Sequence, residues 1–104
     1  MKMLIIIFVS FICTNTTPVT GLNGVYFRKA NQRYVNLGWG KSYPNTVTYY
    51  NTIKRNGVIV ADNYFEQYNR ISIPVESNFQ SATFSVTQTV NGVESVESFV
   101  TVSR

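Results

Sequence analysis

The fold class is decided by one stretch near the C-terminus, SATFSVTQTVNGVESVESFVTV, which spans residues 81–102. Apolar and polar residues alternate on both sides of Asn91-Gly92, as expected for strands with one buried face. Asn-Gly between two such runs is the strongest short signal for a tight hairpin turn. The stretch therefore predicts two antiparallel strands, at residues 81–89 and 93–102.

The register of this hairpin follows from which side chains can share a buried face. A two-residue loop would set the charge of Glu97 opposite Val86, so we predict a three-residue loop, residues 90–92, which pairs Val86 with Val96 and Ala82 with Val100. This register puts one set of side chains on the core face: Ala82, Phe84, Val86, Val96, Val100 and Val102. The other face is expected to be solvated and carries Thr83, Ser85, Thr87, Glu97 and Phe99.

The remainder of the chain has the same character. β-branched and aromatic residues dominate, no stretch shows a helical period, and Asn-Gly recurs at positions 23–24 and 56–57. Further strands are predicted at residues 24–30, 33–39, 46–53, 57–61, 64–68 and 70–75. Pro74 marks the last of these as an edge strand or a bulge. Eight short strands with regular turns predict an all-β fold, a small antiparallel β-sandwich without a disulfide.

The first 21 residues are interpreted as a cleaved signal peptide, which leaves residues 22–104 as a single domain. Lys2 precedes an apolar run at residues 4–13, which is too short to cross a bilayer. Cleavage is expected after Thr16 or after Gly21. The alternative for this segment is a buried N-terminal strand. We expect a secreted protein with no transmembrane anchor, and Cys13 leaves with the signal peptide.

Composition excludes several kinds of catalytic or metal site. The 104-residue chain has no histidine and one cysteine, which excludes a Cys/His zinc site, a Cys–His or Ser–His nucleophile pair and a disulfide framework. Glu94 and Glu97 are the only close acid pair, and strand alternation would put them on opposite faces. Asp62, Asn63 and Glu66 lack calcium-loop spacing and suit a turn instead. We therefore expect no enzymatic activity, no metal and no cofactor.

Charge and aromatic residues gather in the first part of the domain. Residues 22–61 contain six cations and no acid, whereas residues 62–104 contain five acids and two cations. Exposed aromatics beside cations are typical of ligand-binding surfaces. The candidate ligand-binding residues are Trp39, Lys41, Tyr43, Tyr49, Lys54, Arg55, Arg28 and Arg33. For Trp39 the alternative is a core position.

Five segments of the chain follow a common strand pattern: YVNL (34–37), TVTYYN (46–51), KRNGVIVADN (54–63), NRISI (69–73) and SATFSVT (81–87). Through these segments residues 34–90 resemble a V-set-like immunoglobulin domain. The last three segments look like the C′ hairpin, strand D and strand E of the family. The cysteine pair of the family is absent, with Leu37-Gly38-Trp39 where the first cysteine is expected. The resemblance implies an immunoglobulin-like sandwich and a role in recognition or adhesion.

These patterns together predict a secreted, non-enzymatic binding or adhesion module. Its expected partner is an extracellular protein or an anionic or glycan surface, and no nucleic acid is expected. The oppositely charged parts of the domain also allow a homo-oligomer. The alternatives are a secreted carbohydrate-binding protein, a membrane-acting toxin or effector, and a small protease inhibitor.

Overall fold

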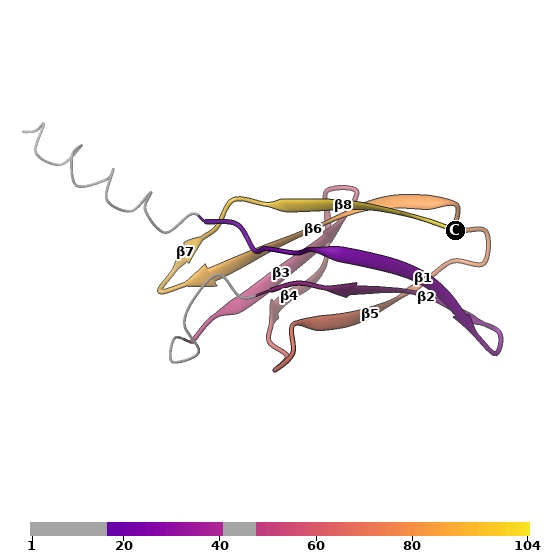
Figure 1. Ribbon diagram of the computed structural model, residues 1–104, viewed down its shortest axis with the longest axis horizontal. Helices are drawn as coiled ribbons and strands as arrows, with labels where there is room; N and C mark the ends of the chain where they lie inside the picture. The colour runs from indigo at the N-terminus through magenta and orange to yellow at the C-terminus, as the bar shows by residue number, and fades with distance from the viewer. Residues whose placement is uncertain (1–16, 41–47) are drawn as a thin grey trace, which may run out of the picture.

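The structure, a computed structural model, describes residues 17–40 and 48–104, which form two antiparallel sheets packed face to face (Figure 1). The strands are β1 (Asn23–Lys29), β2 (Gln32–Gly38), β3 (Tyr50–Arg55), β4 (Val58–Tyr64), β5 (Arg70–Val75), β6 (Ser81–Val90), β7 (Val93–Glu94) and β8 (Ser98–Ser103). One sheet has the order β1-β2-β5, and the other has the order β4-β3-β6-β7 with β8 also paired to β6. The predicted all-β sandwich is confirmed, and the described residues include no cysteine that could form a disulfide.

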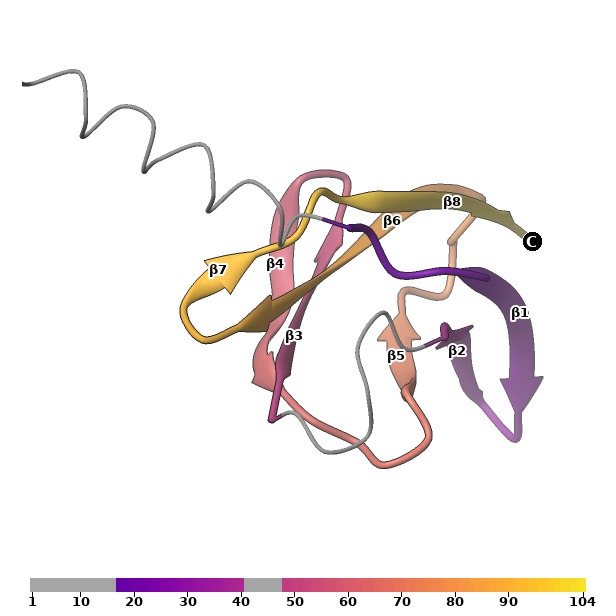
Figure 2. The same cartoon turned by 60° about the vertical axis from the view of Figure 1, so that its left-hand side comes forward.

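Alternating side chains from both sheets build the core. Figure 2 shows β1, β2 and β5 on one side of the molecule and β3, β4 and β6 on the other. The buried apolar side chains between them are Val35, Leu37, Trp39, Ile53, Ile73, Phe79, Ala82, Phe84, Val86 and Val102, together with Val19 before β1. Most of them lie at every second position of a strand, as the period-two pattern requires.

The C-terminal hairpin keeps the predicted core face but not the predicted register. Its turn has two residues, Asn91 and Gly92, both with positive φ (53° and 81°), and Val90 pairs with Val93. The prediction of a three-residue loop was therefore wrong, and so was the predicted core position of Val96, which is 56% exposed. A φ > 0 at both central residues is the geometry that matches the strand twist of a hairpin.

An irregular segment after β7 resolves the conflict between Glu97 and Val86. Ser95 leaves the ladder, donating its N–H to the Gln88 carbonyl and accepting the Gln88 N–H on its hydroxyl. The register then shifts by one residue, so that Val86 pairs with Ser98, Phe84 with Val100 and Ala82 with Val102. The predicted pairs of Val86 with Val96 and Ala82 with Val100 are replaced by these.

Two strand predictions also change. No strand covers residues 65–69, although residues 64–68 were predicted as one, and the predicted strand 46–53 is observed from Tyr50 to Arg55 within the described part. β5 pairs only with β2, so Pro74 lies on an edge strand, as predicted. A proline is tolerated there because its missing N–H would face away from the ladder.

The chain before β1 also belongs to the folded unit. Val19 is buried in the core, and its carbonyl accepts a hydrogen bond of 2.8 Å from the Ser98 hydroxyl. The Thr20 carbonyl accepts the Gly40 N–H at 2.6 Å. β1 itself lies beside β8, where Gly24 faces Val102. Cleavage after Gly21 would remove Val19 and Thr20, whereas cleavage after Thr16 would keep both.

One end of the sandwich is closed by a cluster that we call the Phe79 clamp: Tyr26, Arg33, Arg55, Glu76 and Phe79. The fully buried Phe79 ring lies in the β5–β6 loop and stacks on Tyr26 of β1, with centroids 5.7 Å apart. The Arg55 guanidinium of β3 lies 5.4 Å from the Phe79 centroid and donates two hydrogen bonds, of 2.8 and 2.6 Å, to Glu76. Arg33 Nε donates to the Tyr26 hydroxyl at 2.9 Å. The clamp therefore ties β1 and β2 to β3 without a covalent link.

The Glu76–Arg55 pair predicts a stability change in acid. The hydrogen bonds from Arg55 lower the pKa of the Glu76 carboxyl to about 2, from 4.5. A group whose pKa is lowered on folding stabilises the folded state above its unfolded pKa, and that contribution disappears as the pH falls from about 4.5 to about 2. We expect the difference in melting temperature between the wild type and Glu76→Gln to shrink over this range. A difference that stays constant from pH 7 to pH 2 would contradict the role of the pair.

Candidate binding surface

The segment at residues 65–69, which joins β4 to β5, forms a loop that is held rigid by its own hydrogen bonds. One oxygen of the Glu66 carboxylate accepts the backbone N–H of Tyr68 at 3.0 Å and that of Arg70 at 2.9 Å. The Glu66 carbonyl accepts the Asn69 N–H at 2.9 Å, and Asn69 has a φ of 56°. Asparagine tolerates this left-handed conformation better than most residues. We refer to this segment as the 65–69 loop.

Buried contacts fix the 65–69 loop to both sheets. The Asn69 carbonyl accepts the backbone N–H of Trp39 at 3.1 Å, directly after β2. The Asn69 side-chain oxygen accepts a hydrogen bond of 3.0 Å from the hydroxyl of Tyr49, directly before β3. Phe65 meets the Tyr49 ring edge to face, with centroids 5.6 Å apart. The loop therefore has a defined position on the scaffold.

The 65–69 loop displays two large aromatic side chains to solvent. Phe65 is 55% exposed and Tyr68 is 63% exposed. The Arg70 guanidinium lies 5.2 Å from the Tyr68 centroid, which restrains that ring from one side. An open depression of about 380 Å³ lies between Trp39, Gly40, Gln67, Tyr68 and Asn69. Rigid aromatic groups beside a concave surface are suited to binding.

The residues predicted from sequence do not form one surface. Trp39 is 6% exposed and packs in the core, which is the alternative considered for it, and Tyr49 is buried beneath the 65–69 loop. Lys41 and Tyr43 lie outside the described residues. The four candidate cations that the structure describes lie at two other places, Arg28 and Arg33 on the β1–β2 hairpin and Lys54 and Arg55 on β3.

The basic surface is smaller than the sequence suggests. Lys54 forms an ion pair of 3.7 Å with Glu97, and Arg55 pairs with Glu76 in the Phe79 clamp. Arg28 and Arg33 are direct cross-strand partners on the β1–β2 hairpin. Acids that are distant in the sequence therefore neutralise the two cations of β3, and Arg33 joins the clamp through Tyr26.

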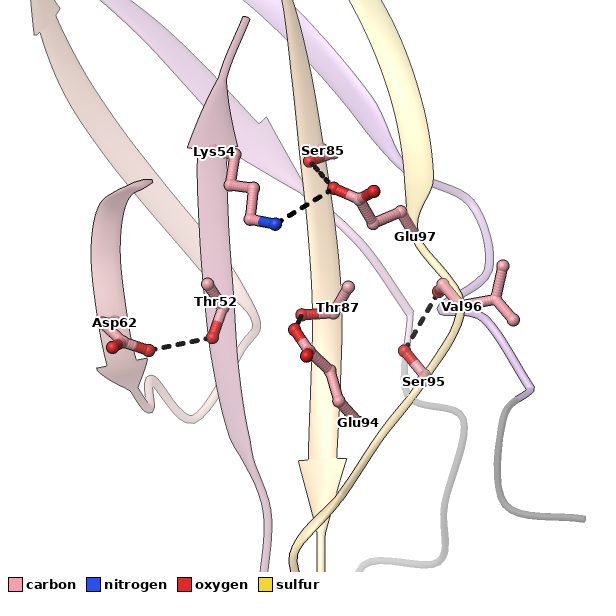
Figure 3. Close-up of polar contacts among 9 residues, drawn as sticks. All are labelled: Thr52, Lys54, Asp62, Ser85, Thr87, Glu94, Ser95, Val96 and Glu97. Atoms are coloured by element: carbon pink, nitrogen blue, oxygen red, sulfur yellow. Dashed lines mark hydrogen bonds and ion pairs between the residues drawn. The ribbon is translucent and has the colours of Figure 1, made fainter. Parts of the chain in front are cut away.

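The outer face of the β4-β3-β6 sheet is covered by carboxylates (Figure 3). Ser85 donates to Glu97 at 2.8 Å, and Thr87 donates to Glu94 at 2.7 Å. Ser85 and Thr87 are buried by these contacts, so the predicted solvated face is wrong for them. The prediction that Glu94 and Glu97 point to opposite faces is also wrong, because the irregular segment after β7 interrupts the alternation. Asp62 accepts a hydrogen bond of 2.9 Å from Thr52 on this face.

The carboxylates are engaged in local contacts. Asp62 accepts the N–H of Asn63 at 3.0 Å as well as the Thr52 hydroxyl, and Glu66 holds the 65–69 loop. Within residues 17–40 and 48–104, no group of three or more acids or cysteines is placed to hold a metal ion. The same residues include no helix long and apolar enough to span a bilayer.

Sequence reasoning missed Phe65 and Tyr68 because residues 64–68 were predicted as a strand. The signal that could have found the loop is its last residue, Asn69; Asn63 lies within β4, where the pairing with β3 is irregular. Both adopt positive φ, 56° for Asn69 and 50° for Asn63, which a regular strand does not contain.

Comparison of the chain with protein-family models, with curated proteins and with solved structures gives no match.

Proposed function

We propose that this chain is a secreted, non-enzymatic binding module that recognises an extracellular or cell-surface protein through the 65–69 loop. One observation carries the proposal: a loop locked by Glu66 and Asn69 displays Phe65 and Tyr68 to solvent. Neighbouring exposed aromatic side chains mark interaction sites more often than single ones do, and tyrosine is enriched among the residues that dominate protein interfaces.

The rigidity of the loop favours affinity. A flexible loop loses conformational entropy when it binds, and a side chain that is already ordered loses less. Tyr68 is restrained by Arg70 and Phe65 by Tyr49 before any ligand arrives. Such preorganised aromatic groups resemble the rigid anchors of antibody paratopes in their physical role.

The strand order supports an immunoglobulin-like interpretation of the sandwich. In that fold strands A, B and E share one sheet, while C, F and G share the other with C′ beside C. The order β1-β2-β5 corresponds to A-B-E, and β4-β3-β6-β8 corresponds to C′-C-F-G. On this correspondence residues 70–75 and 81–90 take the places of strands E and F, rather than D and E as the sequence resemblance implies. The 65–69 loop then lies at one end of the sandwich, where loops of this fold cluster.

The test is a binding measurement with the exported chain on intact cells and on arrayed extracellular proteins. We expect Tyr68→Ala and Phe65→Ala to weaken binding about tenfold or more, because truncation of an anchor residue costs about 2 kcal/mol or more. Phe99→Ala is the matched control, since Phe99 is 64% exposed but lies on β8. It should leave affinity unchanged.

Thermal melts separate loss of binding from loss of folding, because Phe65 also contacts Tyr49. Two outcomes would refute the role of the loop: equal effects of all three substitutions, or full binding by a folded Tyr68→Ala variant.

A further inference from the structure

We propose that the outer face of the three-stranded sheet is a second ligand site, which binds an anionic polysaccharide. Charge is the first argument. β1, β2 and β5 carry no Asp or Glu, and of their four cations strand alternation puts Lys29 and Arg70 on the outer face, whereas Arg28 and Arg33 share the inner face with Tyr26. Both side-chain ion pairs in the described part of the chain use cations of β3 instead. The outer face of the three-stranded sheet therefore carries two cations, Lys29 and Arg70, and no acid from its own strands, since the acids lie on the other sheet and in the loops.

A row of flat, apolar side chains crosses the middle of this face. Phe27, Tyr34 and Pro74 are cross-strand partners on β1, β2 and β5. Their neighbours Val35 and Ile73 are buried, so strand alternation puts the row on the outer face. The rings of Phe27 and Tyr34 stack with centroids 5.2 Å apart. The negative face of an aromatic ring suits the C–H groups that line one face of a sugar ring.

The rows on either side supply polar and charged groups. Asn36 and Ser72 are partners in the next row, and the Ser72 hydroxyl donates to the Asn36 side-chain oxygen. Beyond them, Arg70 is the partner of Gly38, and its Cγ lies 3.9 Å from the position that a Cβ on Gly38 would occupy. The Arg70 stem therefore lies beside Gly38 on the outer face, at ordinary van der Waals distance. At the opposite end Lys29 pairs with Gln32.

This arrangement matches a sugar polymer that carries sulfate or carboxylate groups. The cations Lys29 and Arg70 stand at opposite ends of the face, about 20 Å apart at about 3.3 Å per strand residue. Between them lie an aromatic row for ring stacking and an amide–hydroxyl row for sugar hydroxyl groups. A single-stranded nucleic acid is normally bound by cations that follow its backbone and by several successive aromatic platforms. The face has one aromatic row and separated cations, which favours the polysaccharide.

The experiment measures affinity for immobilised heparin, a sulfated polysaccharide, at increasing salt. The variant Lys29→Ser/Arg70→Ser removes the cations at both ends of the face. Its control, Lys54→Ser/Arg104→Ser, makes the same change in net charge away from the face. We expect the first variant to lose at least tenfold in affinity and the control to change less than twofold. Phe27→Leu keeps the charge and an apolar side chain but removes the ring, and we expect a loss of about threefold or more.

Each other outcome would overturn the site. Equal losses of heparin affinity in the two double variants would mean that heparin responds only to the net charge of the protein. Unchanged binding by a folded Phe27→Leu variant would mean that no ring is stacked. Polyglutamate or single-stranded DNA that binds as tightly as heparin, with the same response to the variants, would identify a different polyanion as the ligand. Because the Arg70 guanidinium also lies over the Tyr68 ring, Tyr68→Ala separates this site from the 65–69 loop, and it should leave heparin binding unchanged.

Discussion

Phe79→Ala is expected to destabilise the domain by about 3–5 kcal/mol, the usual cost of deleting a fully buried phenylalanine. Phe79 is completely buried, stacks on Tyr26 and lies under the Arg55 guanidinium, so its loss removes the centre of the Phe79 clamp. Within the described residues no disulfide holds β1 and β2 to β3 when the Phe79 ring is lost. Urea denaturation followed by tryptophan fluorescence measures the change, because Trp39 is a buried reporter in the same core.

Two companion variants separate the contributions of the ring. Phe79→Leu preserves much of the buried volume but loses the stacking and the contact with the guanidinium, so we expect an intermediate loss. Phe99→Ala deletes an equally large side chain that is mostly exposed, and it should change stability by less than about 0.5 kcal/mol. A loss below about 1 kcal/mol for Phe79→Ala would show that the clamp does not support the core.

Gly24→Ala is expected to cost about 1–3 kcal/mol, although alanine is normally no worse than glycine within a strand. A Cβ at Gly24 would lie 2.5 Å from Val102 Cγ2 and 2.9 Å from Leu37 Cδ2, both buried. Those distances are far below van der Waals contact, so β1 and β8 would have to move apart. Equilibrium unfolding in urea measures this change in the free energy of unfolding.

The control for this substitution is Gly38→Ala on the neighbouring strand. A Cβ at Gly38 would meet its nearest neighbours, the side chains of Asn23 and Arg70, at 3.8 Å or more, so stability should hardly change. The double variant Gly24→Ala/Val102→Ala should lose less stability than the two single variants lose in sum, since shortening Val102 makes room for the new methyl group. Strict additivity would argue against a steric conflict at this position.

The sequence predicted the sandwich well because period-two alternation and Asn-Gly turns act locally. It predicted the core face of β6 and β8 correctly but misplaced Val96, since an irregular segment three residues long, and not the turn, shifts the register. Either a longer turn or an irregular segment after the turn can keep Glu97 from facing Val86. The sequence of the hairpin does not distinguish the two, because the choice depends on the hydrogen bonds of the complete sheet. The failure was therefore one of backbone geometry and not of hydrophobic pattern.

The binding surface was harder to predict because burial depends on distant partners. Trp39 and Tyr49 have the side chains of ligand-binding residues, yet both support the 65–69 loop from below. Arg55 meets Glu76 only when the β5–β6 loop folds back onto β3. Glu76 is 21 residues away from Arg55 in the sequence. The count of cations in residues 22–61 therefore overestimated the unpaired positive charge on β3.

The packing of β1 against β8 has a consequence for how the chain folds. The first and last strands meet where Gly24 faces Val102, and Ser98 bonds to Val19. Contacts between residues so far apart in the sequence form slowly, because a long loop must close before they can stabilise anything. The core therefore cannot close until residues 98–102 have been synthesised. Late closure of the core suits the proposed passage through a secretion channel, which an unfolded chain can enter.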